Sequence, residues 1–333
     1  MYDLIGLVNA VTDVIVPATD EEIVSLGFEK GIFKQWEDIN YAGLLEMIKS
    51  NQRAIDIYPG GSAANVMIDA VCLFEEQKQM RNAALLGTVG TDNYGQKYKE
   101  YVKNSRVISL LSTDEGDSGV CYALVVPSGE KALTAKLNVA KNLSYDLYLL
   151  AENLSEKSLF HTTGYEILSN PIKTISTTVY MKQSSAKISF DVASPDAVKY
   201  QRSYVEQMIK NSDILFITEE EAGALLNVSP CDTTTYECLE SIAKLCPTTI
   251  LKRGKKGSIV LFFGEKYDIG AVPVKVVNTN GAGDAYAAGF LTKYLQGLYS
   301  DREWVHPAKC GEYGATIAGR VCEIEEGHLK KIV

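Results

Sequence analysis

Residues 278–290 read Asn-Thr-Asn-Gly-Ala-Gly-Asp-Ala-Tyr-Ala-Ala-Gly-Phe and follow a β-branched, apolar segment at 272–277. Apolar residues at helical spacing come after them, so the pattern predicts a strand, a glycine turn and a helix. Gly281 and Gly283 allow positive φ and close backbone approach, and the free N–H groups of a helix N-terminus lie at the positive end of its dipole. We therefore predict that the backbone of Gly281, Ala282 and Gly283 can hold a phosphate.

Asp284 directly follows this turn. A carboxylate beside a bound phosphate can take the proton from an attacking hydroxyl while the amides stabilise the transferring group. The alternative is an ordinary first-turn carboxylate, which the helix dipole favours without any catalytic role. The choice between them depends on the rest of the chain.

The composition bounds the class of protein. The 333 residues are 46% hydrophobic and 23% charged, which is enough for one large core. The net charge of -9 argues against nucleic acid or an anionic membrane as the main partner, because either requires a basic face. No apolar run approaches the ~18 residues of a membrane span. Seven scattered cysteines without a Cys-x-x-Cys pair indicate free thiols, and we expect a cytoplasmic protein.

A second glycine-to-helix junction lies at 60–65, which reads Gly-Gly-Ser-Ala-Ala-Asn. Apolar residues continue behind it at helical spacing, with Ser62 placed as the N-cap and Asn65 one turn into the helix. Gly60 and Gly61 allow backbone amides to approach a substrate closely. A capped helix packed on its strand is the alternative explanation.

Asn9 and Asp13 follow the first apolar run, at 4–8. Ligands of α/β sheets bind just beyond the carboxyl ends of strands, so these two side chains are candidates for holding hydroxyl groups. Asn and Asp also occur in loops for their own hydrogen bonds, which is the other interpretation.

The second half of the chain sets the fold class. From about residue 156, short β-branched runs alternate with helical patterns, which predicts a parallel, doubly wound α/β sheet with helices on both faces. The runs at 118–126 and 132–135 flank a tight turn and interrupt this rhythm. They predict a β-hairpin that forms a lid or a side sheet outside the parallel core.

Polar clusters follow two of these strands. Thr218 opens a run of glutamates that ends at Glu221, where a carboxylate either complements the helix dipole or holds metal-bound water. Lys252, Gly254 and Gly257 either lie along a nucleotide or form a hairpin turn. The sequence lacks a P-loop, Gly-x-Gly-x-x-Gly, Gly-x-Ser-x-Gly and His-Glu-x-x-His, which disfavours the enzyme classes that carry those motifs.

In order and spacing, these features resemble the ribokinase-like carbohydrate kinases, or phosphofructokinase B (pfkB) family, across essentially the whole chain. Gly60-Gly-Ser-Ala-Ala-Asn65 is similar to the amino-terminal glycine signature of the family, and Thr279-Asn-Gly-Ala-Gly-Asp284 to its carboxy-terminal signature. The resemblance implies a three-layer α/β/α ribokinase-like domain over 1–333. Its small β-sheet lid would come from approximately 10–40 and 112–136.

The resemblance also implies transfer of the γ-phosphoryl group of ATP to a hydroxymethyl group, with Mg²⁺ and a monovalent cation as candidate cofactors. Asp284 is then the general base, Gly281, Ala282 and Gly283 form the anion hole, and Glu221 binds Mg²⁺ through water. The acceptor site would comprise Asn9, Asp13, Gly60, Gly61, Asn65 and Tyr165, and the ATP site Thr218, Lys252, Gly254 and Gly257.

Two positions depart from the family pattern. Asn278 stands where the signature usually has Asp, which removes a charge near a monovalent-cation site. Thr218 stands where the magnesium motif usually has Asn, which affects the details of metal coordination. Neither departure changes Asp284 or Glu221, so activity is still expected.

The acceptor has several candidates. Asn9-x-x-x-Asp13, the segment 26–31 and the di-glycine are more similar to the adenosine-kinase-like branch than to ribokinase proper, which favours a nucleoside. Glu166 is unusual for that branch, so a free sugar or another nucleoside is an alternative. A nucleoside-binding homologue without catalysis is the alternative from another class, and a dehydrogenase is a distant third. We expect a monomer or homodimer with no nucleic-acid or membrane partner.

Overall fold

The computed structural model describes residues 1–30, 33–50, 56–147, 150, 152–299, 305–324 and 328–329. Within them, nine strands form one large sheet, in the spatial order β14 (Glu265–Ile269), β13 (Ser258–Phe262), β12 (Thr248–Lys252), β11 (Ile214–Thr218), β10 (Lys187–Asp191), β9 (Leu159–Thr163), β1 (Leu4–Leu7), β5 (Ala83–Val89) and β6 (Ile108–Thr113). Neighbours from β12 to β6 pair in parallel, and β13 and β14 are added antiparallel.

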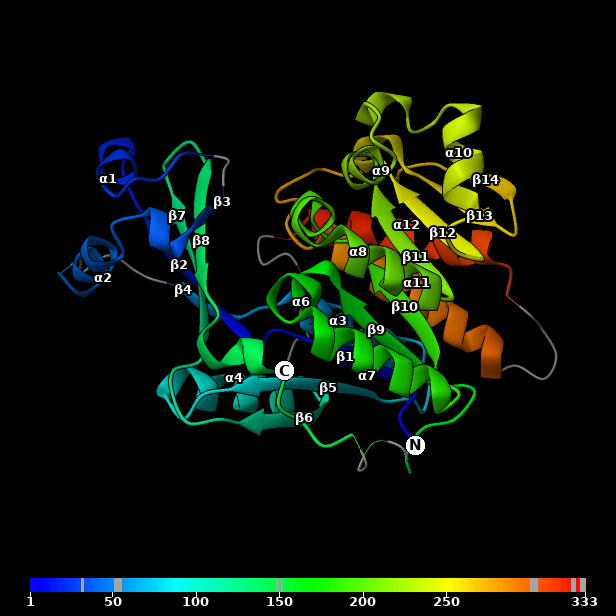
Figure 1. Cartoon of the computed structure of the whole chain (residues 1–333), viewed down its shortest axis with the longest axis horizontal. Helices are drawn as coiled ribbons and strands as arrows, with labels where there is room; N and C mark the ends of the chain where they lie inside the picture. The colour runs from blue at the N-terminus through cyan, green and yellow to red at the C-terminus, as the bar shows by residue number, and fades with distance from the viewer. Residues whose placement is uncertain are drawn as a thin grey trace.

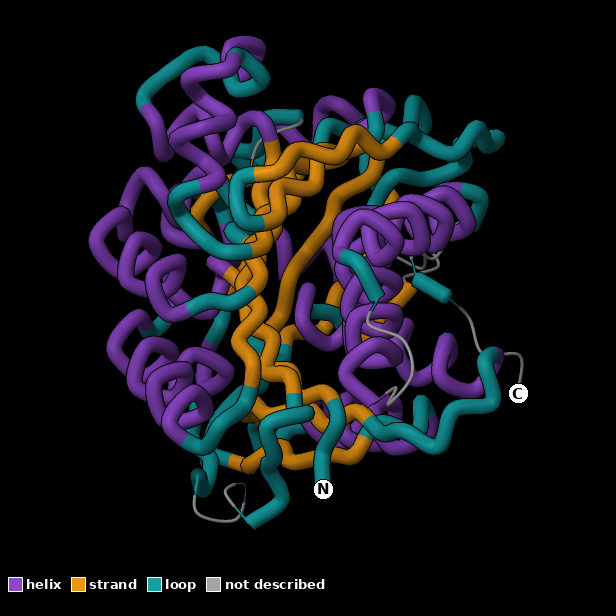
Figure 2. Tube along the Cα trace, turned by 90° about the vertical axis from the view of Figure 1, so that its right-hand side faces the viewer, coloured by secondary structure: helices purple, strands orange, loops and turns teal. Residues whose placement is uncertain are grey.

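Helices cover both faces of this sheet, as Figure 2 shows with the strands seen between two layers of helices. One face packs against α3 (Ser62–Glu76), α4 (Asn93–Asn104), α11 (Ala282–Tyr299) and α12 (Pro307–Cys322). The opposite face packs against α6 (Gly164–Ser169), α7 (Pro171–Gln183), α8 (Pro195–Asn211), α9 (Glu219–Leu226) and α10 (Tyr236–Ala243). β1 and β5 are buried along their whole length and, apart from Thr88 of β5, are apolar, as central parallel strands are, and the predicted three-layer parallel fold is confirmed.

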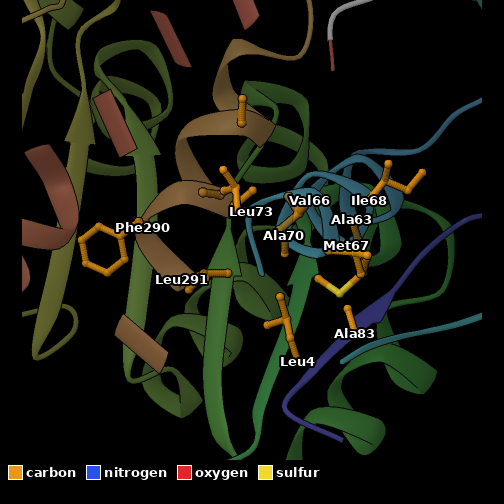
Figure 3. Close-up of a cluster of buried hydrophobic side chains, with 14 of the residues drawn as sticks. Leu4, Ala63, Val66, Met67, Ile68, Ala70, Leu73, Ala83, Phe290 and Leu291 are labelled. Carbon is orange, nitrogen blue, oxygen red and sulfur yellow. The ribbon is translucent and has the colours of Figure 1, made fainter. Parts of the chain in front are cut away.

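On the first face, α3 lies over β1 and packs against α11 (Figure 3). Leu4 of β1 lies beneath Ala63 and Met67 of α3, and Phe290 and Leu291 of α11 belong to the same buried cluster. The two glycine-to-helix junctions predicted from the sequence are the N-termini of these same two helices. Packing of α3 against α11 therefore brings both junctions to one end of the sheet.

A smaller sheet stands apart from the large one, at the left of Figure 1. Its order is β3 (Phe33–Gln35), β8 (Lys131–Lys136), β7 (Gly119–Val125), β2 (Val11–Pro17) and β4 (Asp56–Pro59), and α1 (Asp20–Ser25) and α2 (Tyr41–Ser50) pack on one side of it. The antiparallel β7–β8 pair confirms the hairpin outside the parallel core. Most of this sheet comes from the predicted lid segments, of which residues 31–32 lie outside the described residues. Its closure over a ligand stays a prediction.

Short 3-10 helices complete the described secondary structure, at Trp36–Asp38, Asn138–Asn142, Pro230–Asp232 and Gly254–Lys256. None of the described helices is long and apolar enough to cross a bilayer.

The strand predicted at 272–277 is wrong. This segment is irregular, and Val276 is 58% exposed. The amide groups of Val277 and Asn278 donate to the carbonyl of Cys322 at the end of α12, at 2.8 and 3.2 Å, instead of to a neighbouring strand. Pro273 also lacks a backbone donor, which disfavours a sheet position. The β-branched run therefore leaves the sheet and crosses to the end of α12.

The α11–α12 contact depends on the small size of Gly289. A Cβ atom at that position would lie 3.0 Å from the Cα of Gly314 and 2.9 Å from a side-chain carbon of Ile317. We expect Gly289→Ala to lower the free energy of unfolding by about 1–3 kcal/mol, because the helices would have to separate. Urea denaturation measures this, with Gly270→Ala as the control, since a Cβ there meets no atom within 4 Å. Equal stability of both variants would contradict the close-packing argument.

Candidate active site

Two helix N-termini meet at Asp284. Its Oδ1 accepts a hydrogen bond from Ser62 Oγ at 2.6 Å, and its Oδ2 accepts one from Asn65 Nδ2 at 2.9 Å. Ser62 is therefore not the N-cap that the sequence predicted. Gly61 occupies the cap with φ at +100° and no side-chain bond, which frees the Ser62 hydroxyl to reach Asp284. The interaction joins residues 222 positions apart.

The predicted anion hole lies at the start of α11. Gly281 adopts a φ of +73°, and the first helical hydrogen bond runs from the amide of Ala285 to the carbonyl of Gly281 at 2.8 Å. The amide of Ala282 donates to Thr279 at 3.3 Å. Among the described residues, the amides of Gly281 and Gly283 have no hydrogen-bond acceptor. They are available to an anion, and the helix dipole favours one there.

A pocket of about 870 Å³ opens beside this helix end. All four predicted ATP-site residues line it, together with Glu221 and two of the three anion-hole residues: Thr218, Lys252, Gly254, Gly257, Ala282 and Gly283. An apolar wall that the sequence analysis missed completes it, with Val272, Pro273, Val274, Val276, Ala315 and Ala318. The β-branched run at 272–277 is the available signal for this wall, but its pattern predicts a strand.

Lys252 lies next to Gly283 of the predicted anion hole. Its Nζ contacts Asp191 Oδ2 at 2.6 Å, and a Cβ atom on Gly283 would lie 3.6 Å from that Nζ. Although burial disfavours its charged form, Asp191 and Glu221 hold the pKa of Lys252 above its usual value. Asp191 was not a predicted site residue, since nothing in the sequence marks its pairing with Lys252.

Burial raises the pKa of Asp284 to about 6, and the hydrogen bonds from Ser62 and Asn65 oppose this effect. The nearby charge of Asp191 raises the pKa further and that of Lys252 lowers it. A carboxyl group with this pKa is mostly ionised at neutral pH yet is a stronger base than an ordinary aspartate. This is the range that suits a general base.

Glu221 has a local partner of its own. Thr218 is the N-cap of α9, and the two residues form a capping box: the amide of Thr218 donates to Glu221 Oε2 at 2.8 Å, and the amide of Glu221 to Thr218 Oγ1 at 3.2 Å. Threonine caps a helix much as asparagine does, so this departure from the family pattern preserves the local geometry. Burial raises the pKa of Glu221, and Lys252 opposes that shift.

Asp13 lies against the di-glycine. A Cβ atom on Gly60 would collide with the Asp13 carboxylate, so any other residue at position 60 would displace that carboxylate. Tyr98 fixes the same turn by donating its hydroxyl to the Gly60 carbonyl at 2.8 Å. Burial raises the pKa of Asp13 to about 6, and a hydrogen bond with Cys121 opposes the shift. Cys121, which pairs with Asp13 across β2 and β7, is a neighbour that the sequence did not reveal.

Asn9 lies at this end of β1, but its amide group is engaged within the protein. Its Nδ2 donates to the carbonyl of Tyr165 at 3.0 Å, and its Oδ1 accepts from Ser169 at 2.9 Å. Glu166, the residue unusual for the nucleoside branch, is buried. Its carboxylate accepts hydrogen bonds from the backbone N–H of Asn9 and from the backbone N–H and hydroxyl of Thr163. The Tyr165 side chain, in contrast, is 45% exposed.

The site thus brings the predicted anion-hole amides, the Asp284 carboxylate and Lys252 together at the carboxyl end of a parallel sheet, an arrangement suited to binding a phosphate in an α/β protein. The sequence profile described as pfkB family carbohydrate kinase matches residues 38–323. The chain belongs to this family.

Relatives include both sugar and nucleoside kinases. Adenosine kinase 2 of Arabidopsis thaliana is 23% identical over 334 residues, covering 95% of this chain and 94% of that protein. An uncharacterized sugar kinase of Archaeoglobus fulgidus is 26% identical over 241 residues, covering 72% and 91%. The structure of adenosine kinase from Schistosoma mansoni in complex with 2-fluoroadenosine matches with a TM-score of 0.81 at 18% identity, covering 98% of this chain and 97% of that one. The ribokinase-like fold is confirmed.

The raised pKa of Asp284 predicts a pH-dependent loss of stability. Because the folded pKa of about 6 exceeds the unfolded value of 3.8, ionisation disfavours the folded state. The free energy of unfolding of the wild type should therefore fall relative to that of Asp284→Asn as the pH rises from about 4 through 6, by on the order of 2 kcal/mol. Urea titrations of both proteins at several pH values measure the difference. A stability difference between the two proteins that does not change with pH would contradict the raised pKa of Asp284.

Proposed function

We propose that this protein is an ATP-dependent kinase that phosphorylates the hydroxymethyl group of a nucleoside, with adenosine as the first candidate acceptor. One observation carries the proposal: Ser62 and Asn65 hold Asp284 beside the unpaired amides of Gly281 and Gly283. A base and an anion hole are thus adjacent, as phosphoryl transfer from ATP to an alcohol requires.

In the proposed mechanism, the acceptor hydroxyl lies against Asp284, which removes its proton as the oxygen attacks the γ-phosphorus. The bond from that phosphorus to the bridging oxygen of ATP breaks, and ADP leaves. The amides of Gly281 and Gly283 bind the oxygens of the transferring group, and Lys252 adds positive charge from below. Such a reaction needs positioning and charge stabilisation more than covalent help. The nucleotide would occupy the 870 Å³ pocket, with its base against the wall at Val274 and Ala318.

The Glu221 carboxylate fits a role in holding Mg²⁺. One of its oxygens accepts from the Thr218 amide, and the residue lines the nucleotide pocket. Among the described residues, no group of three or more potential ligands could hold a metal alone. Mg²⁺ characteristically binds one or two carboxylates, water and substrate phosphates, so a single carboxylate suits it. When bound, the ion would neutralise phosphate charge.

Tyr165 favours a nucleoside over a free sugar, and Glu166 does not oppose one. The exposed Tyr165 ring offers a surface for stacking a base, and Asn9 fixes the backbone behind it. The Glu166 carboxylate accepts hydrogen bonds from Asn9 and Thr163, so it is no argument against a nucleobase in the acceptor. The free-sugar alternative has no use for the exposed ring.

The alternative of a silent nucleoside-binding homologue is disfavoured by Asp284 itself. Binding alone does not need a carboxylate kept in a buried position near Asp191, where ionisation disfavours folding.

The proposal predicts ATP-dependent phosphorylation of one member of a panel of adenosine, inosine, guanosine, cytidine, ribose, fructose and fructose 6-phosphate. Asp284→Asn should lower kcat by roughly 10²- to 10⁴-fold, because the base is lost while the donor groups remain. In the wild type, kcat/KM should fall below about pH 6 as Asp284 becomes protonated. Mass spectrometry of the products and pH-rate profiles are the measurements, with ATP binding by Asp284→Asn as the folding control. No product from any member despite ATP binding would sink the proposal for these acceptors.

Stacking on Tyr165 predicts that Tyr165→Ala raises KM for the nucleoside about tenfold, because base–aromatic stacking contributes roughly 1–3 kcal/mol. Tyr165→Phe, which keeps the ring, should retain most of the affinity. Tyr200→Ala is the matched control, since Tyr200 is another exposed aromatic, on α8, and none of the predicted acceptor-site residues lies on that helix. Steady-state kinetics test all three. An unchanged KM in Tyr165→Ala would favour a free sugar as the acceptor.

A further inference from the structure

One face of α3 carries a polar stripe. Successive spacings of three, four, three and four residues place its members on the same side of the helix. The other faces of α3 are apolar and buried, as Figure 3 shows for Ala63, Val66 and Leu73. The stripe comprises Ser62, Asn65, Asp69, Cys72 and Glu76.

Every member of the stripe contacts an element from the C-terminal part of the chain. Ser62 and Asn65 bind Asp284 of α11, as described above. At the other end, Arg320 of α12 donates to both carboxylate oxygens of Glu76, at 2.8 and 2.9 Å. Between them, Asp69 and Cys72 contact Leu329, near the C-terminal end of the sequence.

The Leu329 contact is buried and specific. Its amide donates to Asp69 Oδ1 at 2.7 Å, its carbonyl accepts from Cys72 Sγ at 3.7 Å, and its side chain is buried in the core beneath α3. The preceding His328 lies edge-on to the Tyr101 ring of α4, with its Nε2 2.9 Å from the Tyr101 hydroxyl. Two consecutive residues thus bind α3 and α4 together.

Asp69 is an uncommon choice for this position. Its side chain is fully buried, and its Oδ2 has no hydrogen-bond partner among the described residues. Burial raises its pKa to about 8; the Leu329 amide lowers it, Asp284 raises it and Arg320 lowers it. Asp69 is therefore mostly neutral at pH 7 and accepts the Leu329 amide as an uncharged acid.

We infer that His328 and Leu329 form a C-terminal latch that holds α3 where Ser62 and Asn65 orient Asp284, with Asp69 as its positioning residue. The inference rests on the proposed function, because it assigns Asp284 a catalytic role. Asp69 lies one turn from Asn65 on the same face, so a shift of the helix at Asp69 also moves the two donors. Displacements of about 1 Å can lower the rate about 10²-fold.

The test compares two substitutions of Asp69 in the full chain. Asp69→Asn keeps an uncharged acceptor of the same shape, and we expect kcat within about twofold of wild type. Asp69→Leu keeps the volume but leaves the Leu329 amide without its acceptor. We expect Asp69→Leu to lower kcat about tenfold or more, with KM for ATP little changed.

The pH profile separates positioning from general destabilisation. Hydrogen bonds from Ser62 and Asn65 lower the pKa of Asp284, so loosening them should move the acid limb of kcat/KM to higher pH in Asp69→Leu but not in Asp69→Asn. Asp13, Asp191 and Lys252, the charged groups besides Asp69 that interact with Asp284, stay unchanged in both variants. The control is Val205→Ala, which creates a cavity at α8 on the opposite face of the sheet. It should leave the acid limb of the kcat/KM profile unchanged.

Hydrogen exchange of the backbone amides of residues 62–68 tests the latch without depending on catalytic activity. Exchange should increase in Asp69→Leu and in Leu329→Pro, which removes the donor from the other end of the bond, and not in Asp69→Asn. If Asp69→Leu fails to fold, Leu329→Pro carries the test. Unchanged exchange and an unchanged acid limb in Leu329→Pro would overturn the latch. A wild type without turnover would instead sink the proposed function, while the exchange result still decides the latch.

Discussion

The hydrogen bonds from Ser62 and Asn65 to Asp284 join the two halves of the site. Each side of this contact is a helix N-terminus that follows glycines, and the helices α3 and α11 are held together by the apolar cluster over β1. Small residues along α11 also allow close packing against α12, as at Gly289. The position of the carboxylate is thus set by core packing, and the glycines leave the space around it open.

The charges around the site work against stability. Asp191, Glu221 and Asp284 surround Lys252, so one ammonium faces three carboxylates in a partly buried region. Burial raises the pKa of both Glu221 and Asp284, which means that their ionised forms are disfavoured in the fold. Bound Mg²⁺ and phosphate would rearrange these charges. An arrangement that disfavours folding without ligands is typical of a site selected for function.

The sequence predicted the features that depend on local chemistry. The glycine turns, the alternating strands and helices, and the β7–β8 hairpin have local signals, and the structure confirms them. The run at 272–277 failed because β-branched residues favour a strand only where a neighbouring strand is present, and here the partner is the end of α12. The pairing of Lys252 with Asp191 and the engagement of Asn9 with Tyr165 depend on long-range packing, which no local pattern encodes.

Glu166 shows why a motif departure must be judged by its contacts. From the sequence, an acidic residue next to Tyr165 argues against a nucleobase, because a charge would face the base. In the structure, the carboxylate turns inward, caps α6 through Thr163 and receives the amide of Asn9. Glu166 therefore connects the end of β1 to the start of α6, which carries Tyr165. Thr218 follows the same logic, since its capping box with Glu221 reproduces the local geometry that asparagine would give. At both strand ends, a side chain that satisfies the backbone fixes the position of its neighbours.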